Sequence, residues 1–353
     1  MKKVAILTIT NSGMNFGNRL QNYALQEALR NVGAKVATIR SAKSIGHSFF
    51  LSNTRRLVKG VINNSIRKKL YSEFEREYIE YDPDFRYENI NESSFADKYD
   101  IFIAGSDQIW NPYFKFNSDF EFATFAPSKK RYSYAASIGV TELDEEKRKK
   151  LTENLLGMRR LSIREQDGVE LVKELTGIVP ARHIDPTMLL DIEEYIKIEK
   201  KPKNSLPEKY LFMYFLGNVS GEYQKNVREI ASAFDLEIVQ FSENPGDSMY
   251  NLGPLNFLYI VHHADFVCTD SLHGLIFSLL YKKKFAIFTR QDKEVSMNGR
   301  MQTMISLFGL ESRMIENLQK DYELDIDYVG IEKRLSLERE KSFSYLREII
   351  NEP

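Results

Sequence analysis

Short apolar runs alternate with amphipathic segments of helical periodicity twice along the chain, and this alternation constrains the fold more than any other feature. In the first series, apolar runs at 4–9 and 35–40 flank a helical segment that ends at Gly33. A strand, a helix and a strand in such close succession form a βαβ unit, whose crossover requires a parallel sheet. Further apolar runs at 99–105 and 130–137 continue the series. The first half therefore predicts one doubly wound lobe.

The same alternation restarts after 200–207, a stretch rich in lysine and proline that is the best candidate for a linker. Two series of this kind predict an α/β protein of two doubly wound, Rossmann-like lobes, which bind ligands beyond the carboxyl ends of their strands. The predicted parts are an N-terminal lobe at 1–198 with a helical insertion at about 45–95, a C-terminal lobe at 208–325, and a helix at 330–353 that packs back on the N-terminal lobe.

Charge and composition exclude several classes of protein. A net charge of −1 gives no general attraction to nucleic acid. The single cysteine excludes a disulfide within the chain and a cysteine-built zinc site, and its apolar surroundings are typical of a buried, inert thiol. No apolar stretch approaches the ~20 residues that span a bilayer, and the N-terminal apolar run is too short for a signal peptide. We therefore expect a soluble, cytoplasmic protein.

The loop after the first strand brings amide side chains and a cation to the start of a helix. The residues concerned are Asn15, Asn18, Arg19 and Asn22. Their glycine neighbours have the spacing of neither a dinucleotide fingerprint nor a P-loop. Amides and a cation at a helix start suit sugar hydroxyls or an anion. The alternative is a plain strand-to-helix turn.

The segment after the third strand gathers Asp107, Gln108 and Trp110, the only tryptophan. Carboxylate and amide groups pair with sugar diols, and an indole face stacks on a pyranose ring. The alternative is that Asp107 caps a helix and Trp110 belongs to the core.

Arg164 lies at a later strand-to-helix junction. There its guanidinium can offer a bidentate fork to a carboxylate or a phosphate, with backbone amides of the helix start nearby. The alternative is a surface ion pair between Arg164 and Asp167.

In the second half, Ser271, His273 and Gly274 open the helix that follows an apolar run. A hydroxyl, an imidazole and the amides of a helix start would together bind a phosphate, and the anion would keep the imidazole protonated as an acid. Arg300 is a candidate for a second cation. The alternative is a structural histidine.

Residues 55–70 alternate basic with apolar side chains, and no acid follows before Glu73. A basic amphipathic helix of this kind can rest on an anionic membrane surface, at the inner face of the membrane. A lipid-linked sugar acceptor would explain such a helix. The alternative is a solvated face of a helix packed on the N-terminal lobe.

Taken together, these motifs resemble the polysaccharide pyruvyl transferase family, in the right order and over nearly the whole chain. The matching blocks are N-F-G-N-R-L-Q-N-Y-A-L at 15–25, A-G-S-D-Q-I-W-N-P at 104–112, S-I-R-E-Q-D-G at 162–168, I-D-P-T at 184–187 and T-D-S-L-H-G at 269–274. Members of the family often carry Phe where this chain has Leu272, a change between apolar residues. The resemblance implies a fold similar to the two-lobed glycosyltransferase B type.

The resemblance also implies the transfer of pyruvate from phosphoenolpyruvate to a sugar diol of a surface-polysaccharide precursor, for an exopolysaccharide or a capsule. It implies phosphoenolpyruvate binding by Arg164, Ser271, His273, Gly274 and Arg300. In the reaction that follows, His273 is the candidate acid and Asp107 the candidate base. The acceptor side would comprise Asn15, Asn18, Arg19, Asn22, Gln108 and Trp110.

No step of this reaction needs a metal or a cofactor, and no cluster of metal ligands stands out in the sequence. Two other functions stay open. One is a glycosyltransferase that uses a nucleotide sugar on the same two-lobed frame. The other is a non-catalytic protein that binds an anion or a sugar.

Overall fold

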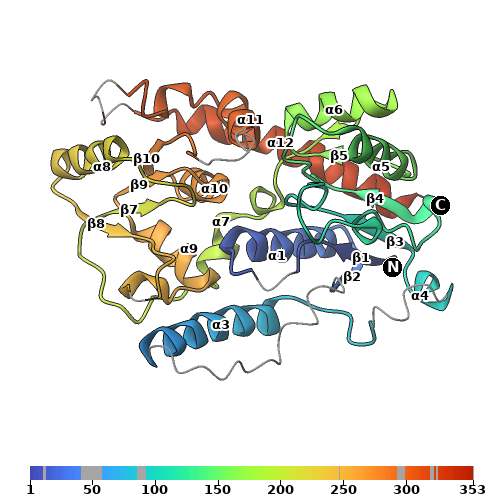
Figure 1. Ribbon diagram of the computed structural model, residues 1–353, viewed down its shortest axis with the longest axis horizontal. Helices are drawn as coiled ribbons and strands as arrows, with labels where there is room; N and C mark the ends of the chain where they lie inside the picture. Colours follow the sequence, from blue (N-terminus) through green and yellow to red (C-terminus); the bar gives the residue numbers. More distant parts are fainter. Residues whose placement is uncertain are drawn as a thin grey trace. The chain divides into compact units, whose positions relative to one another are not determined.

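Two parallel sheets organise the chain in the computed structural model, which describes residues 1–10, 13–40, 58–85, 93–245, 247–291, 299–318, 322 and 325–352 (Figure 1). The chain divides into an N-terminal unit, Met1–Ser52, Glu75–Leu190 and Ser336–Pro353, and a C-terminal unit, Asn53–Phe74 and Asp191–Leu335. Each unit has its own four-stranded sheet with helices between the strands, which confirms the predicted α/β fold class.

The sheet of the N-terminal unit has the strand order β2-β1-β3-β4, and all its pairs are parallel. Its strands are β1 (Lys3–Leu7), β2 (Lys35–Ile39), β3 (Ile101–Ala104) and β4 (Arg131–Ser133), and a short parallel pair is formed by β5 (Ser162–Ile163) and β6 (Ala181–Arg182). The helices of this unit include α1 (Phe16–Asn31), α4 (Ser93–Asp97), α5 (Glu145–Leu156) and α6 (Gln166–Thr176). Ala5 and Leu7 of β1 join the core that contains Leu155 of α5 and Val172 of α6. The β1 residues that alternate with Ala5 and Leu7 point to the other face of the sheet and are also buried. The strand is therefore a continuous apolar run, as is typical of a parallel sheet that is covered on both faces.

The C-terminal unit repeats this arrangement with the order β10-β9-β7-β8, again all parallel. Its strands are β7 (Tyr210–Tyr214), β8 (Glu237–Gln240), β9 (Phe266–Thr269) and β10 (Lys284–Ile287), and its helices include α7 (Ile192–Ile196), α8 (Gly221–Ala233), α9 (Pro254–His263), α10 (Leu272–Leu280) and α11 (Gly299–Phe308). Met213 packs on the α8 face of the sheet, whereas Tyr214 packs against Phe257 of α9. Cys268 is fully buried, and burial raises the pKa of its thiol, in agreement with the predicted inert cysteine.

The predicted helical insertion divides between the units. Of the described part, α3 (Val58–Tyr78) belongs to the C-terminal unit as far as Phe74, whereas the sequence predicted an insertion wholly within the first lobe. The reason is Arg67, which is only 2% exposed. Its guanidinium lies 4.8 Å from the ring centroid of Tyr250 and 3.5 Å from a carboxylate oxygen of Glu243, both in the C-terminal unit.

Arg67 is therefore one cation of the predicted membrane-binding helix that faces protein and not lipid. Arg55 and Arg56 of the same helix lie outside the described residues. Lys69 lies 3.7 Å from Glu73, an i,i+4 pair on the helix surface. None of the described helices combines the length and the apolar character that crossing a bilayer requires.

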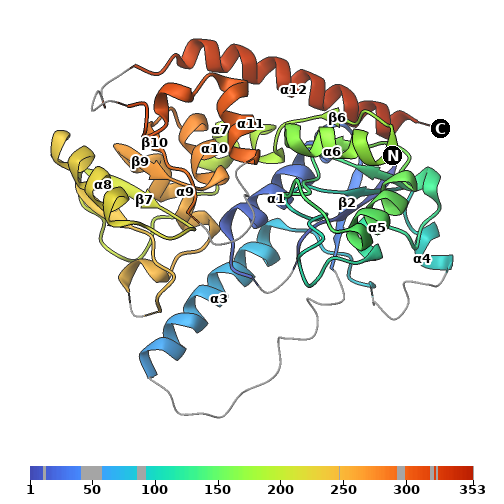
Figure 2. The same ribbon diagram turned by 45° about the horizontal axis from the view of Figure 1, so that its top comes forward.

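The C-terminal helix α12 (Tyr328–Asn351) is a single long helix (Figure 2). From Ser336 onward it belongs to the N-terminal unit, where Tyr345 donates to the carbonyl of Ser133 at 2.9 Å. The boundary between 190 and 191 comes before the predicted 198 because Tyr195 of α7 packs edge-on against Phe277 of α10.

A buried histidine lies beneath α12 in the N-terminal unit. His183 is 5% exposed and packs against the rings of Tyr134 and Tyr345. Its Nδ1 is 2.8 Å from the hydroxyl of Ser162, which already accepts from the amide of Ala135. The hydroxyl can donate its own proton to Nδ1 of the neutral imidazole. Burial lowers the pKa of His183 from 6.5 to about 4.

We expect this histidine to destabilise the N-terminal unit in acid. The unfolded state takes up a proton below pH 6.5 and the folded state only near pH 4, so stability falls as the pH decreases through that window. The loss amounts to about 3 kcal/mol from a shift of this size. His183→Gln should show a flatter dependence of the free energy of urea unfolding on pH between 6.5 and 4, measured by circular dichroism. Parallel slopes in the two proteins would refute the assignment.

Candidate functional site

The strand order of each unit reverses at one point, and polar residues gather there. In the N-terminal unit the reversal falls between β1 and β3, and in the C-terminal unit between β7 and β9. Ligands of doubly wound sheets bind at such switch points, where the loops after neighbouring strands diverge. Each unit therefore has one candidate site of its own.

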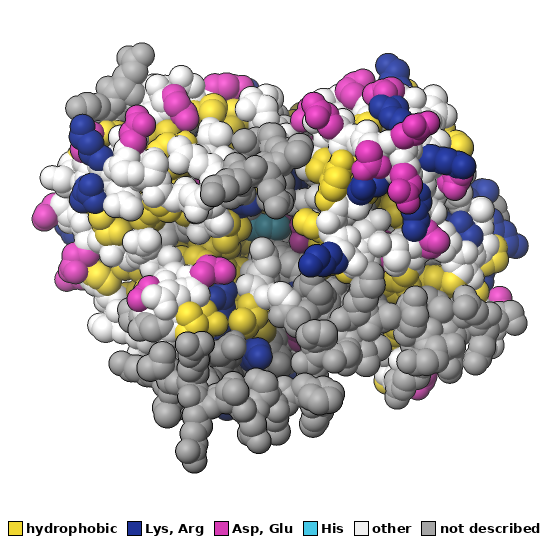
Figure 3. All heavy atoms as spheres, in the orientation of Figure 1, with side chains coloured by type: hydrophobic (Ala, Val, Ile, Leu, Met, Phe, Trp, Pro, Cys, Tyr) yellow, Lys and Arg dark blue, Asp and Glu magenta, His cyan; other side chains and the backbone are white. Residues whose placement is uncertain are grey.

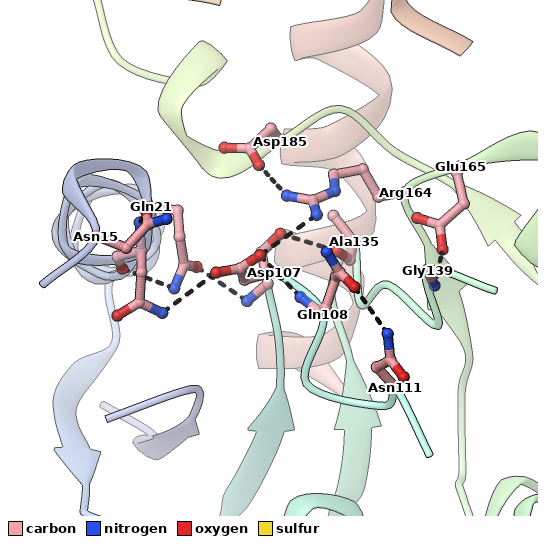
Figure 4. A network of polar contacts seen from close by, with 12 residues as sticks. Asn15, Gln21, Asp107, Gln108, Asn111, Ala135, Gly139, Arg164, Glu165 and Asp185 are labelled. Atoms are coloured by element: carbon pink, nitrogen blue, oxygen red, sulfur yellow. Dashed lines mark hydrogen bonds and ion pairs between the residues drawn. The ribbon is translucent and has the colours of Figure 1, made fainter. Parts of the chain in front are cut away.

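Asp107 follows β3 at the switch point of the N-terminal unit. The preceding Gly105 has φ 141°, and a Cβ there would lie 2.1 Å from the carbonyl oxygen of Tyr134, so only glycine fits. Asp107 itself has φ 66°, a left-handed conformation that costs free energy for a residue with a side chain and is common at functional sites. Its Oδ2 accepts from the Asn18 side chain at 3.3 Å, and its Oδ1 lies 3.7 Å from Nη2 of Arg164 (Figure 4). The side chain of Asp107 is 15% exposed.

Arg164 lies directly after β5 and is 5% exposed, so the alternative of a surface pair with Asp167 is wrong. Its Nη1 donates to Asp185, a carboxylate that in turn accepts from the amide and the hydroxyl of Thr187 at 3.0 and 2.7 Å. Burial lowers the pKa of Arg164, but the carboxylates of Asp185, Asp107 and Glu165 outweigh it, so the net shift is upward. The guanidinium is therefore a fixed cation.

Two donors of Arg164, Nε and Nη2, are buried and have no hydrogen-bond partner among the described residues. They lie on the same edge of the guanidinium, which is the edge that forms bidentate hydrogen bonds with a carboxylate or a phosphate. A buried charged donor without a hydrogen bond is costly, and Nη2 has only the 3.7 Å ion pair with Asp107, so such an edge points to a ligand.

Glu165 is a second buried group at this site, 3% exposed, and sequence reasoning did not select it. Its Oε1 accepts from the amides of Ile138 and Gly139 at 2.9 and 3.1 Å, while Oε2 has no hydrogen-bond partner among the described residues. Figure 4 shows Glu165 and Gly139 on one side of the network and Gln108 with Asn111 nearby. Asn111 donates to the side-chain oxygen of Gln108 at 2.8 Å.

The structure divides the predicted acceptor residues into two groups. Asn15 is the exposed N-cap of α1, Asn18 contacts Asp107, and Arg19 donates to Asn18 at 2.6 Å and to Glu75 at 2.9 Å. With Gln108, these residues lie at or beside the switch point. The other two predicted acceptor residues, Asn22 and Trp110, lie in the interior.

Asn22 and Trp110 were predicted to bind the acceptor, and both predictions are wrong. Asn22 is 3% exposed and accepts from the hydroxyl of the fully buried Thr38 at 2.9 Å. Trp110 is 0% exposed, stacks on Phe122 at 5.0 Å and donates its indole N–H to the carbonyl of Glu121. The ring therefore belongs to the core, the alternative that the sequence left open, and no sugar can stack on it.

In the C-terminal unit, Asp270 connects the two loops at the switch point by hydrogen bonds. Its carboxylate accepts from the amides of Leu216 and Gly217 at 2.7 and 2.8 Å, which ties the loop after β7 to the end of β9. The side chain is 1% exposed. Arg290, just beyond β10, places its Nε 3.7 Å from the same carboxylate.

Helix α10 begins beside this carboxylate. Ser271 is its N-cap and accepts from the amide of Gly274 at 3.4 Å. A Cβ on Gly274 would lie 2.2 Å from Oγ1 of Thr269, so glycine allows the helix to approach β9 closely. His273, 7% exposed, lies in the first turn. The helix start, its hydroxyl cap and this imidazole are thus in one place, as the sequence predicted.

Arg300, the predicted second cation, lies in the first turn of α11 and is half-buried. The arginine that the structure places against Asp270 is Arg290, which sequence reasoning missed. Its signal was available, because Arg290 follows the strand next to β9 and the carboxyl ends of parallel strands meet at one edge of the sheet. Asp185 and Asp270 were inside recognised motifs but received no role.

Charge elsewhere is mixed. On the face shown in Figure 3, acidic and basic side chains of the described residues are interspersed and do not form a patch of one sign. This distribution is consistent with the net charge of −1 and favours neither a nucleic-acid surface nor a lipid surface there.

Comparison with solved structures confirms the fold. A Listeria monocytogenes protein assigned as a UDP-N-acetylglucosamine 2-epimerase superposes with a TM-score of 0.56 at 15% identity, covering 99% of this chain and 97% of its own. The UDP-GlcNAc 2-epimerase of Methanocaldococcus jannaschii gives 0.51 at 12% identity, with 96% and 99% coverage. UGT89C1 of Arabidopsis thaliana gives 0.51 at 10% identity, with 99% of each chain covered. At such identities the likeness concerns the fold alone, a two-lobed Rossmann-like architecture of the glycosyltransferase B type.

Comparison with curated proteins gives no match. The family model "Polysaccharide pyruvyl transferase" matches residues 15–292, which include the switch points of both units. The five blocks of the predicted resemblance all fall within this range. The chain belongs to the polysaccharide pyruvyl transferase family.

Proposed function

We propose that this protein transfers pyruvate from phosphoenolpyruvate to two hydroxyls of a sugar in a surface-polysaccharide precursor, which produces a cyclic ketal and phosphate. Membership of the family supports a transferase of this class. The observation that carries the specific donor is the edge of Arg164, where two buried donors, Nε and Nη2, lack a hydrogen-bond partner among the described residues.

Phosphoenolpyruvate fits this edge because it carries a carboxylate and a phosphate on adjacent positions, and either group accepts two parallel N–H bonds. Asp185 holds the opposite side of the guanidinium, so the fork cannot rotate away. A neutral sugar hydroxyl offers a single uncharged oxygen, whereas a carboxylate or a phosphate offers two charged oxygens that match the two donors. The geometry of Arg164 and the family of the chain both support an anion-binding role.

In the proposed reaction, His273 protonates the methylene carbon of phosphoenolpyruvate, which becomes a methyl group and leaves the central carbon electrophilic. One sugar hydroxyl attacks that carbon and loses its proton to Asp107. The C–O bond to phosphate then breaks, the second hydroxyl adds to the same carbon, and its proton leaves with the phosphate. The central carbon thus loses the π bond to the methylene carbon and the C–O bond to phosphate, and it gains two C–O bonds to the sugar.

The C-terminal cluster is assigned to the phosphate. The start of α10 offers backbone amides and a positive dipole end, and Ser271 and His273 lie within its first turn. Arg290 takes the place that the sequence gave to Arg300, since it is the arginine beside Asp270. A cation oriented toward the bond that breaks stabilises the departing charge.

The test is an assay with phosphoenolpyruvate and a panel of galactosides, glucosides and mannosides, each offered free, nucleotide-linked and lipid-linked. We expect phosphate release that depends on one acceptor class, together with a product whose mass increases by one pyruvate ketal. Omission of the acceptor is the control for simple hydrolysis.

Two other results would replace the proposal. Transfer of a glycosyl group from a nucleotide sugar, without competition by phosphoenolpyruvate, would identify a glycosyltransferase. Binding of phosphoenolpyruvate or a sugar in calorimetry, without phosphate release on any acceptor, would identify a non-catalytic binding protein.

A further inference from the structure

The C-terminal unit contains a cluster of potential metal ligands away from its switch point. Glu199, His262 and His263 each present a ligand atom, and the three atoms lie within 4.8 Å of one another. Glu199 follows α7, whereas the two histidines lie at the end of α9. His262 comes 63 residues after Glu199 in the sequence. This separation explains why the sequence showed no ligand cluster.

The carboxylate of Glu199 is held in place from both sides of its backbone. The amide of Glu199 donates to the carbonyl of Tyr195 at 3.0 Å, which continues the turn of α7. The next amide, that of Lys200, donates to the carbonyl of Leu255 in α9 at 3.0 Å. The segment is therefore already fixed to the helix that carries the histidines.

Both imidazoles are also oriented before any ligand binds. The ring of His262 stacks on Tyr281 at 4.6 Å with an interplanar angle of 11°, and that of His263 stacks on Tyr259 at 3.9 Å and 17°. Nδ1 of His263 lies 2.9 Å from the carbonyl oxygen of Tyr259, so it carries the proton and donates in the neutral ring. Hydrogen bonding of one ring nitrogen to a carbonyl is the usual way in which a metal-binding histidine is oriented.

The spacing of the donor atoms suits a small divalent ion. Nδ1 of His262 lies 2.9 and 3.1 Å from the two oxygens of Glu199, and the three ligand atoms, one from each residue, lie within 4.8 Å of one another. Metal–ligand distances of about 2.0–2.2 Å in a tetrahedral zinc site bring neighbouring ligand atoms to roughly 3.4 Å of one another. The His262–Glu199 separations are shorter than that value and the others do not exceed 4.8 Å, so side-chain rotations can bring the three ligand atoms to it.

We propose that Glu199, His262 and His263 bind a divalent transition-metal ion of the zinc type. Two imidazole nitrogens and one carboxylate favour zinc, copper, nickel or cobalt over magnesium and calcium, which prefer oxygen ligands. The side chain of His263 is 43% exposed, so a water molecule can complete a four-coordinate site. The bound ion joins the segment after α7 to the end of α9 and stabilises the C-terminal unit.

The experiment uses full-length protein without an affinity tag, freed of metal by dialysis against a chelator. Zinc binding is measured by calorimetry, and cobalt binding by the visible absorption that a four-coordinate Co²⁺ complex produces. We expect one equivalent of zinc per chain, a higher unfolding temperature in its presence, and a cobalt spectrum typical of four ligands.

Glu199→Gln and His262→Gln should each weaken zinc binding by at least about tenfold, since each removes one of three protein ligands. Glu194→Gln is the matched control, because Glu194 is a nearby carboxylate that pairs with Lys197 on the surface. It should bind zinc as the unaltered protein does. The proposal fails if the unaltered protein binds no zinc, or if Glu199→Gln and His262→Gln bind it with unchanged affinity. In either case the cluster is a set of polar contacts between Glu199 and the two histidines.

Discussion

Replacement of His273 by asparagine is expected to lower kcat for pyruvyl transfer by about 10³-fold, the middle of the range for loss of a general acid. Asparagine keeps a polar side chain in the first turn of α10 but cannot give up a proton. The Ser271 cap and the close contact at Gly274 do not involve the imidazole, so the helix should stay in place. The measurement is acceptor-dependent phosphate release, with phosphoenolpyruvate binding followed by calorimetry.

A matched variant on the same helix separates chemistry from structure. Ser278→Ala removes a hydroxyl that donates to the carbonyl of Gly274 at 2.7 Å, further along α10. It should retain turnover close to that of the unaltered protein. If His273→Asn binds phosphoenolpyruvate and still turns over at the original rate, the histidine is not the acid.

Arg164→Lys should produce the second large effect, a decrease in kcat/KM for phosphoenolpyruvate of about 10²–10³-fold. Lysine keeps the positive charge that Asp107 and Asp185 require, but its ammonium cannot present two parallel donors. Two charge-assisted hydrogen bonds at about 1.5–3 kcal/mol each would be lost or weakened, and each 1.36 kcal/mol corresponds to tenfold in rate.

Arg182→Lys is the control for this exchange. Arg182 lies in β6, within the same small sheet as the strand before Arg164, and forms an ion pair with Glu338 at 3.6 Å. Its replacement should leave kcat/KM nearly unchanged. An Arg164→Lys protein with normal kcat/KM would show that the Nε–Nη2 edge does not hold the donor, whatever its effect on stability.

Each unit has an aspartate in the loop that follows its third strand along the chain, Asp107 after β3 and Asp270 after β9. Asp270 is bound by two backbone amides and is almost fully buried, so it positions the loop after β7 and Arg290. Asp107 contacts side chains, is partly exposed and adopts a left-handed backbone conformation. This difference is the reason that Asp107, and not Asp270, is the candidate base.

The strands and most helices could be predicted from the sequence because each is a continuous apolar or periodic run. The apolar run at 4–9 is found as β1, Lys3–Leu7, and the run at 35–40 as β2, Lys35–Ile39. β6 was missed because a two-residue strand has no periodicity. The unit to which α3 belongs was also not predictable, since it depends on contacts of Arg67 with residues nearly two hundred positions away.

For the candidate site, too, the features that depend on local sequence could be predicted, and those that depend on contacts between distant residues could not. Strand-end motifs identified Asp107, Arg164, Ser271 and His273, because the carboxyl ends of parallel strands are where such sheets bind ligands. The partners of these residues are distant in sequence, such as Asp185 for Arg164, and no local pattern indicates them. The prediction for Trp110 was wrong because the local sequence does not distinguish a core tryptophan beside polar residues from a tryptophan in a sugar site.

The core position of Trp110 also determines what an optical experiment on this protein reports. The chain has one tryptophan, and its indole is enclosed in the N-terminal unit against Phe122. Intrinsic tryptophan fluorescence therefore monitors that unit alone, whereas far-ultraviolet signals come from the helices of both. Unfolding curves from the two signals will coincide if the units melt together and will separate if the C-terminal unit melts independently.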